Sequence, residues 1–150
     1  MKTKTFLFSI LFSLSIFGCN AGAPPSGSSD GSIVYLSDQT FKQKVFNYET
    51  QTEWKFVGNK PCLIDFYADW CSPCRMLSPI LEELAKEYKD KIVVYKINTD
   101  KERILSQNLG IQSLPTLLFC PLDGKPQASM GYRSKEDLKK IIDEVLLKNK

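Results

Sequence analysis

Two cysteines separated by two residues are the strongest chemical signal in this 150-residue sequence. Cys71 and Cys74 follow an apolar segment that predicts a buried strand, and they open a segment with helical periodicity. This placement puts the first sulfur at a helix N-terminus, where free N–H groups and the helix dipole favour a thiolate. We therefore predict thiol–disulfide exchange, with Cys71 as the nucleophile and Cys74 as the thiol that resolves the mixed disulfide.

A zinc site, a haem attachment site and a pair of inert buried thiols are the other interpretations of such a pair. A structural zinc site needs four ligands, but the sequence has no His, and Cys62 and Cys120 do not form a second close pair. Haem attachment requires His directly after the second cysteine, where Arg75 stands. We expect no metal, while the inert pair stays open because no sequence pattern proves reactivity.

Alternating strands and helices must position the two cysteines. Short runs of apolar and β-branched residues predict strands at 33–36, 62–67, 92–97 and 116–120, and the turn at Asp123-Gly124 predicts a last strand at 127–130. Capping residues and helical periodicity predict helices at 38–48, 73–88, 101–108 and 135–146. This order predicts an α/β fold in which a central mixed β-sheet is flanked by helices on both faces.

The first 18 residues have the pattern of a secretory signal peptide. Lys2 and Lys4 precede an apolar run from Phe6 to Phe17. Twelve helical residues span about 18 Å, which is shorter than the roughly 30 Å hydrocarbon core of a membrane. A cleaved signal is therefore the favoured interpretation of residues 1–18, and an uncleaved signal anchor is the weaker one.

The end of this signal, Ile16-Phe17-Gly18-Cys19, resembles the bacterial lipoprotein signal, in which the cysteine becomes lipidated. Phe17 departs from that pattern, where the residue is usually smaller. Cleavage after Ala21-Gly22-Ala23 is the alternative, although the following Pro24 tends to obstruct it. Residues 19–31 are rich in Gly, Ser, Ala and Pro, so we expect a flexible tether between the lipid and a single domain at 32–150.

The charge of the chain gives no indication of a nucleic-acid partner. It has 20 basic and 17 acidic residues, and removal of Lys2 and Lys4 with the signal leaves 18 − 17 = +1. The lysines near the C-terminus alternate with acidic residues, as on a solvated helix face.

From residue 33 to residue 148 the chain resembles the thioredoxin family. The resemblance rests on several motifs in the family's order and spacing: Asp65-Phe66-Tyr67-Ala68-Asp69-Trp70-Cys71-Ser72-Pro73-Cys74, Pro79-Ile80-Leu81, Lys96-Ile97-Asn98-Thr99-Asp100, Gly110-Ile111, Leu114-Pro115-Thr116, Gly124 and Gly131. It implies a thioredoxin fold and a redox-active Cys71–Cys74 disulfide that needs no cofactor.

The resemblance also implies a substrate groove beside the disulfide. Pro115 corresponds to the family's cis proline, and the backbone of Leu114 would pair with an extended substrate segment. Trp70, Leu114 and Gly131 would line the groove, with Ser72 and Pro73 between the cysteines. Without the resemblance, a structural role is an equally good interpretation, with Leu114 as a core residue and Gly131 as a turn residue. Ser72 replaces the Gly most common in thioredoxins, so the resemblance does not fix the redox potential.

Asp65 stands alone among apolar residues in the expected strand at 62–67. Burial would raise the pKa of its carboxyl group and make it a proton acceptor for Cys74. The family counterpart of Asp65 has this role, and Lys96 resembles the lysine beside it. A carboxylate that faces solvent at the strand end is the alternative.

Cys62 and Cys120 lie in apolar strands, where free cysteine usually behaves as a small hydrophobic residue. In oxidising surroundings they can instead pair across adjacent strands or serve regulation. Their Cα separation decides between these interpretations.

We expect a protein-disulfide reductase, because Trp-Cys-x-Pro-Cys with a buried Asp resembles reducing thioredoxins, whereas strongly oxidising relatives usually carry His between the cysteines. A disulfide oxidase or isomerase, a cytochrome-maturation reductase and a non-catalytic binding or chaperone module are the alternatives. The expected location is the periplasmic side of a bacterial membrane, with a lipid anchor. Expected partners are exported proteins with disulfides and a membrane electron donor, and the chain is expected to be a monomer.

Overall fold

The computed structural model describes residues 31–148. The expected signal peptide at 1–18, the lipidation site Cys19 and nearly all of the expected tether at 19–31 lie outside the described residues. These three expectations therefore stay predictions. Within the described part of the chain, no helix has the length and apolar content to cross a membrane.

A five-stranded sheet in the order β1-β3-β2-β4-β5 forms the centre of the fold. Its strands are β1 (Val34–Tyr35), β2 (Cys62–Tyr67), β3 (Val93–Asn98), β4 (Thr116–Cys120) and β5 (Gln127–Met130). β3 runs parallel to both β1 and β2, whereas β4 is antiparallel to β2 and to β5. The predicted mixed sheet is confirmed, with β2 at its centre.

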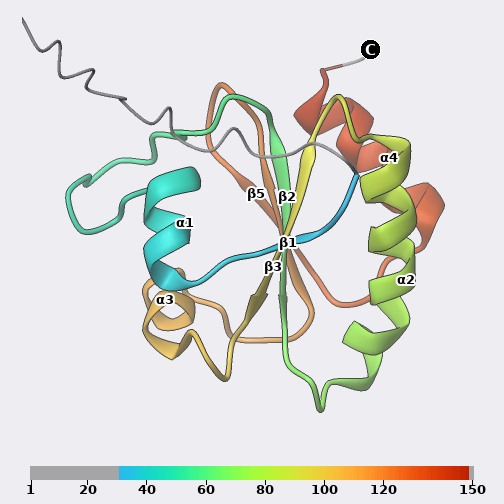
Figure 1. Ribbon diagram of the computed structural model, residues 1–150, viewed down its shortest axis with the longest axis horizontal. Coiled ribbons are helices and arrows are strands. Elements are labelled where there is room, and N and C mark those ends of the chain that lie inside the picture. Colours follow the sequence, from blue (N-terminus) through green and yellow to red (C-terminus); the bar gives the residue numbers. More distant parts are fainter. Residues whose placement is uncertain (1–30, 149–150) are drawn as a thin grey trace, which may run out of the picture.

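Helices cover both faces of the sheet, as predicted (Figure 1). The helices are α1 (Asp38–Lys44), α2 (Ser72–Glu87), α3 (Arg103–Asn108) and α4 (Lys135–Ile141), and α4 continues into a π-helical turn, η1 (Ile142–Leu146). Figure 1 shows α1 and α3 on one side of the strands and α2 and α4 on the other.

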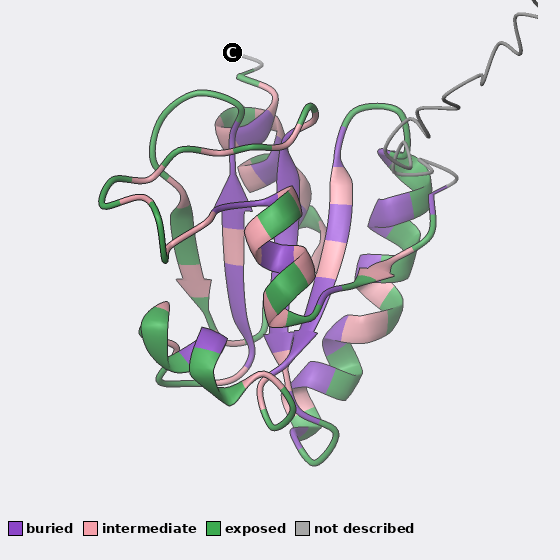
Figure 2. Ribbon diagram, turned by 60° about the vertical axis from the view of Figure 1, so that its left-hand side comes forward, coloured by how far each residue is buried: buried purple, intermediate pink, exposed green. Residues whose placement is uncertain are grey.

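The two faces of β2 contribute to two separate apolar cores, because alternate side chains of a strand point to opposite faces. Leu63 packs with leucines of α2 and with Leu138 of α4. Ile64 and Phe66 pack on the other face with Phe41 of α1 and others. Figure 2 shows that buried residues run through the central strands, so β2 is held firmly from both sides.

The first helix is shorter than predicted, since it ends at Lys44 instead of near Tyr48. Its start is as predicted, because the side chain of Ser37 accepts a hydrogen bond from the Thr40 N–H at 3.3 Å. Beyond its end, the Val45 carbonyl accepts from the N–H of Val57 at 2.9 Å, so it is not available to a further helical turn.

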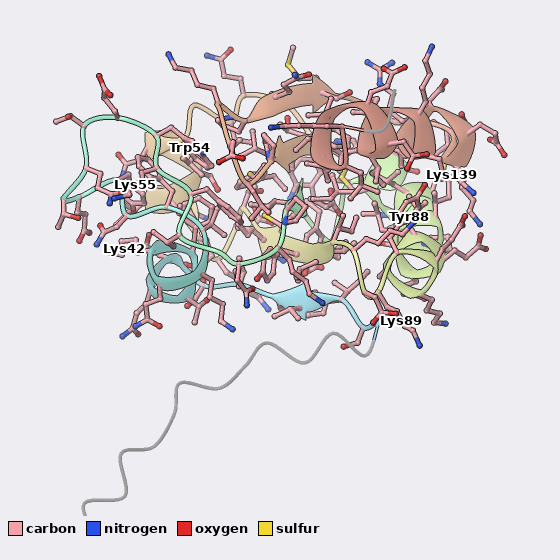
Figure 3. The ribbon with its side chains drawn as sticks, turned by 90° about the horizontal axis from the view of Figure 1, so that it is seen from above. Lys42, Trp54, Lys55, Tyr88, Lys89 and Lys139 are labelled. Carbon is pink, nitrogen blue, oxygen red and sulfur yellow. A yellow bond between two sulfur atoms is a disulfide. The ribbon has the colours of Figure 1, made fainter. Side chains whose placement is uncertain are left out.

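The loop between α1 and β2 contains an aromatic contact that packs on the core containing Phe41. The ring of Trp54 packs against Phe46 with a centroid distance of 4.7 Å. Figure 3 shows Trp54 and Lys55 on the same side of the molecule as Lys42 of α1, and Tyr88 and Lys139 on the opposite side. This loop therefore belongs to the face that α1 covers.

The described chain begins against the C-terminal end of α2. A Cβ atom added to Gly31 would lie 3.1 Å from the Cα of Lys86 and 3.2 Å from the Cβ of Lys89. Gly31 has a φ of +81°, a conformation that glycine adopts without strain. Both its backbone conformation and its close contact with α2 therefore favour glycine at this position.

Candidate active site

Cys71 and Cys74 lie where β2 leads into α2. β2 ends at Tyr67, a short loop follows, and α2 begins at Ser72 with Cys71 as its N-cap. The two sulfur atoms form a disulfide with an S–S distance of 2.05 Å. In Figure 1 the loop between β2 and α2 is the lowest point of the described chain, so the pair lies at one end of the molecule.

The start of α2 places a backbone donor against the Cys71 sulfur. Cys71 Sγ accepts a hydrogen bond from the Cys74 N–H at 3.3 Å. Pro73, in the first turn, has no N–H to leave without a partner. Since a helix N-terminus stabilises negative charge, this geometry favours the thiolate form of Cys71 once the disulfide is reduced.

A cis peptide bond lies beside the disulfide. The Leu114–Pro115 bond is cis, as the sequence predicted. Leu114 packs against a small cluster that contains both Cys71 and Cys74. The Pro115 carbonyl accepts from the Gly131 N–H at 2.8 Å. Gly131 has a φ of +82° with open space around its missing Cβ, so backbone conformation, not crowding, calls for glycine here.

A hollow of about 360 Å³ opens next to these residues. Its lining residues are Trp70, Thr99, Ile111, Gln112, Ser113 and Leu114. The Trp70 side chain is 69% exposed, and its Nε1–H donates to Asp100 Oδ2 at 2.9 Å. The structure thus brings Trp70 and Leu114 to one hollow with an exposed aromatic side chain, and Leu114 also packs against the cluster that contains Cys71.

Asp65 is fully buried beneath α2. It lies on the same face of β2 as Leu63, which packs against the leucines of α2. Neither carboxylate oxygen has a hydrogen-bond partner among the described residues. Burial raises the pKa of Asp65 from 3.8 to about 6, although the nearby charge of Lys96 opposes the rise. The alternative of a solvent-facing carboxylate is therefore wrong.

Lys96 lies directly beside Asp65 on the neighbouring strand β3. Its Nζ is 3.4 Å from Asp65 Oδ2. It donates a hydrogen bond to Ser78 Oγ at 2.5 Å and lies 4.4 Å from the centre of the Tyr67 ring. Because Ser78 is one helical turn after Cys74, the Asp65–Lys96 pair lies under the first turns of α2.

Ser78 and Tyr67 were not among the site residues predicted from sequence. Both are polar residues at positions where the sequence pattern predicts a buried side chain. Ser78 occupies the position between Cys74 and Leu81 in the apolar stripe of α2, where a polar residue is unexpected. Tyr67 is two residues after Asp65, on the same face of β2. Polar atoms at apolar positions of elements that pack together indicate a buried polar network.

Replacing Lys96 with Met should raise the pKa of Asp65 above about 6, because Lys96 is the charge that lowers it. The measurement is a pH titration of the Asp65 carboxyl carbon by NMR. Lys101→Met is the matched control, since Lys101 lines the same hollow as Lys96 without an ion pair to Asp65. An unchanged or lower pKa in Lys96→Met would contradict this account.

Comparison with known proteins identifies the family. The family model described as Thioredoxin matches residues 32–144. A thioredoxin from Borreliella burgdorferi is 49% identical over 111 residues, which cover 74% of this chain and 95% of that protein. This chain belongs to the thioredoxin family. A thioredoxin from Alicyclobacillus acidocaldarius is 43% identical over 112 residues, which cover 74% of this chain and 95% of that protein.

A solved structure of a mutant thioredoxin from Halobacterium salinarum has the same fold. It superposes with a TM-score of 0.63 and 29% identity, and the match covers 79% of this chain and 95% of that one. The predicted thioredoxin fold is therefore confirmed. The chain is a thioredoxin-type protein-disulfide reductase, with Cys71 and Cys74 at disulfide distance.

Thioredoxins act on protein disulfides through a redox-active disulfide, without a separate cofactor. Within residues 31–148 of this thioredoxin, no group of three or more His, Cys, Asp or Glu side chains is placed to hold a metal ion.

Proposed function

We propose that this thioredoxin reduces disulfides in exported proteins at the outer face of a bacterial membrane, where a lipid on Cys19 holds it. The observation that carries the chemistry is the Cys71–Cys74 pair at the start of α2, with the cis Leu114–Pro115 bond beside it. The pattern of residues 1–18, followed by Cys19, supports the location.

The reaction begins at Cys71 in the reduced protein. Its thiolate attacks one sulfur of a substrate disulfide, which forms a mixed disulfide and releases the first substrate thiolate. Trp70 and Leu114 hold the substrate segment, and the backbone of Leu114 pairs with it as an added strand. This arrangement fits an extended polypeptide beside the disulfide, in keeping with the 360 Å³ hollow next to Leu114.

The second step uses Cys74. Asp65, with a pKa of about 6, is mostly ionised at neutral pH and can accept the proton of the Cys74 thiol. The resulting thiolate attacks the Cys71 sulfur, restores the Cys71–Cys74 disulfide and releases the second substrate thiolate. The substrate disulfide gains two electrons and the protein loses two, so the cycle needs a reductant for the protein.

A membrane electron-transfer protein is the proposed reductant, and the tether at 19–31 would raise the effective concentration of each partner for the other. Inverted membrane vesicles supplied with a reductant are the system to use. We expect them to reduce the Cys71–Cys74 disulfide, as measured by thiol alkylation. Failure to reduce it in the presence of every physiological reductant of the membrane would exclude this source of electrons.

The redox potential of Cys71–Cys74 tests the direction of the reaction. A glutathione or dithiothreitol series should give about −250 mV or lower, close to the reference value for thioredoxins of about −270 mV. A value of about −150 mV or higher would identify a disulfide oxidase or isomerase and overturn the proposed direction.

Cys19→Ser tests the membrane attachment. The wild-type chain should incorporate a labelled fatty acid and remain with the membrane fraction, whereas the variant should lose the label and appear in the soluble fraction. Cys120→Ala is the control, because it removes a cysteine that is buried in the domain. Membrane retention of Cys19→Ser would favour an uncleaved anchor instead.

A further inference from the structure

We propose that Cys62 and Cys120 are a second disulfide site, which closes while the chain folds in oxidising surroundings and then serves as a structural cross-link between β2 and β4. In the structure both are free thiols. The Cys71–Cys74 mechanism does not use either residue, and this proposal rests on the proposed location for the oxidising surroundings in which the bond forms.

The register of the sheet places the two cysteines directly opposite each other. Cys62, the first residue of β2, pairs with Cys120, the last residue of the antiparallel strand β4. Residues opposite each other in an antiparallel pair have Cα atoms about 4.5 or 5.5 Å apart, depending on their hydrogen bonding. Both values fall within the range of about 4.4–6.8 Å that a disulfide spans.

Both side chains point to the same face of the sheet and lie in the same core. Cys62 and Cys120 belong to the cluster that contains Phe41, Ile64 and Phe66. The Cys62 thiol interacts with the Cys120 thiol, and burial together with this neighbour raises the pKa of Cys62. The sulfur atoms thus have the proximity and the shared direction that a bond between them requires.

Complete burial determines when the bond can form. Both residues are 0% exposed, so neither an oxidant nor a reductant reaches them in the folded domain. The raised pKa of Cys62 also keeps its reactive thiolate scarce. A disulfide made before the core closes would therefore stay closed while Cys71–Cys74 is reduced and reoxidised.

The two cysteine pairs lie at opposite ends of β2. Cys62 begins this six-residue strand, whereas Cys71 follows its other end. At about 3.3 Å per residue, the strand alone separates them by about 20 Å, which excludes direct exchange between the pairs in the folded state. The oxidant of Cys62 and Cys120 must therefore be an external disulfide that meets the unfolded chain.

The reaction balances with a small-molecule disulfide as the oxidant. Cys62 and Cys120 lose two protons and two electrons and form one S–S bond, while one glutathione disulfide accepts them and becomes two glutathione thiols. The probe for the experiment is accordingly glutathione disulfide.

The test is a refolding experiment on the full chain carrying Cys19→Ser, Cys71→Ser and Cys74→Ser, which leaves Cys62 and Cys120 as its only thiols. The chain is unfolded in urea with reductant, refolded in detergent with glutathione disulfide, then denatured and alkylated. We expect the loss of two alkyl labels per chain and a linked pair of tryptic peptides, 56–75 with 104–133, since trypsin does not cleave before Pro61 or Pro126.

Two controls make the result decisive. A sample refolded with reduced glutathione should carry both labels, and a variant with an added Cys62→Ala should keep Cys120 alkylated. Near-UV circular dichroism establishes the fold of each sample, and Cys71→Ala with Cys74→Ala replaces the serine pair if the latter does not fold. Full alkylation of both cysteines in a folded sample refolded with glutathione disulfide would overturn the proposal.

Discussion

Cys71→Ser should lower the rate at which the protein reduces a disulfide-bonded substrate such as insulin by on the order of a thousandfold or more, because it removes the nucleophile of the covalent route. The sulfur that it replaces lies at the N-terminus of α2, where Cys74 N–H donates to it. A hydroxyl group at this position stays protonated at neutral pH and does not exchange with disulfides. The measurement is turnover with dithiothreitol as the source of electrons.

Cys74→Ser should fail at a different step. Cys71 still attacks the substrate, but no thiol is left to resolve the product, so a covalent complex between enzyme and substrate should accumulate and be visible by mass spectrometry. Cys62→Ala is the control for the loss of a cysteine as such, and it should retain turnover. Substantial turnover in Cys71→Ser would show that another group carries the reaction and would overturn the role of Cys71 as the nucleophile.

Asp65→Asn should stabilise the folded protein at pH 7 by about 3 kcal/mol. The pKa of Asp65 rises from 3.8 to about 6 on folding, and each pKa unit corresponds to about 1.4 kcal/mol. Asp65 is 0% exposed, so solvent does not reduce this effect. Lys96 keeps its contacts with Ser78 and the Tyr67 ring when the charge of Asp65 is removed, so it is not left without partners.

The sign of this effect depends on pH. Because the folded state holds its proton more tightly than the unfolded state, the contribution of Asp65 to stability is fully present below about pH 4 and is lost as the pH rises through about 6. Urea unfolding should therefore show a large difference between the variant and the wild type at pH 7 and little difference near pH 4. Asp123→Asn, at an exposed position, should change stability at neither pH.

The same substitution should slow the reaction. Without a proton acceptor beneath α2, the Cys74 thiol of the mixed disulfide must lose its proton to water, so resolution should be slower near pH 7 and recover as the pH rises toward the thiol pKa. A variant that is more stable but less active would identify Asp65 as a group kept for catalysis at the expense of stability. Equal stability of the variant and the wild type at pH 7 would contradict the raised pKa.

The cysteine pair and the buried carboxyl group could be predicted from the sequence because their signals are local. A Cys-x-x-Cys between a strand and a helix, and a lone Asp in an apolar strand, are visible within ten residues. Ser78 and Tyr67 were missed because their importance comes from Lys96 on β3, which only the parallel pairing of β2 and β3 brings beside them. The apolar pattern marks Ser78 and Tyr67 as unusual polar positions, but it does not show that Lys96 is their partner.

Two other features depended on the tertiary structure. The early end of α1 follows from the Val57 N–H, which arrives from a loop and occupies the Val45 carbonyl, and no local pattern in α1 shows this. The opposition of Cys62 and Cys120 follows from the register of β2 with β4, which is fixed by strands that are distant in the sequence. Local sequence therefore predicts the elements and the chemistry, whereas the pairing between elements is set by the tertiary structure.

Gly31 enters the domain at the C-terminal end of α2, whereas Cys71 caps the N-terminal end of the same helix. The 16 residues of α2 separate these ends by about 24 Å. With a lipid on Cys19, as we propose, the domain would be attached to the membrane at the end opposite its disulfide. The Cys71–Cys74 disulfide would then face away from the membrane, toward proteins in the compartment. The domain would have to rotate on its tether before this disulfide could contact a donor embedded in the bilayer.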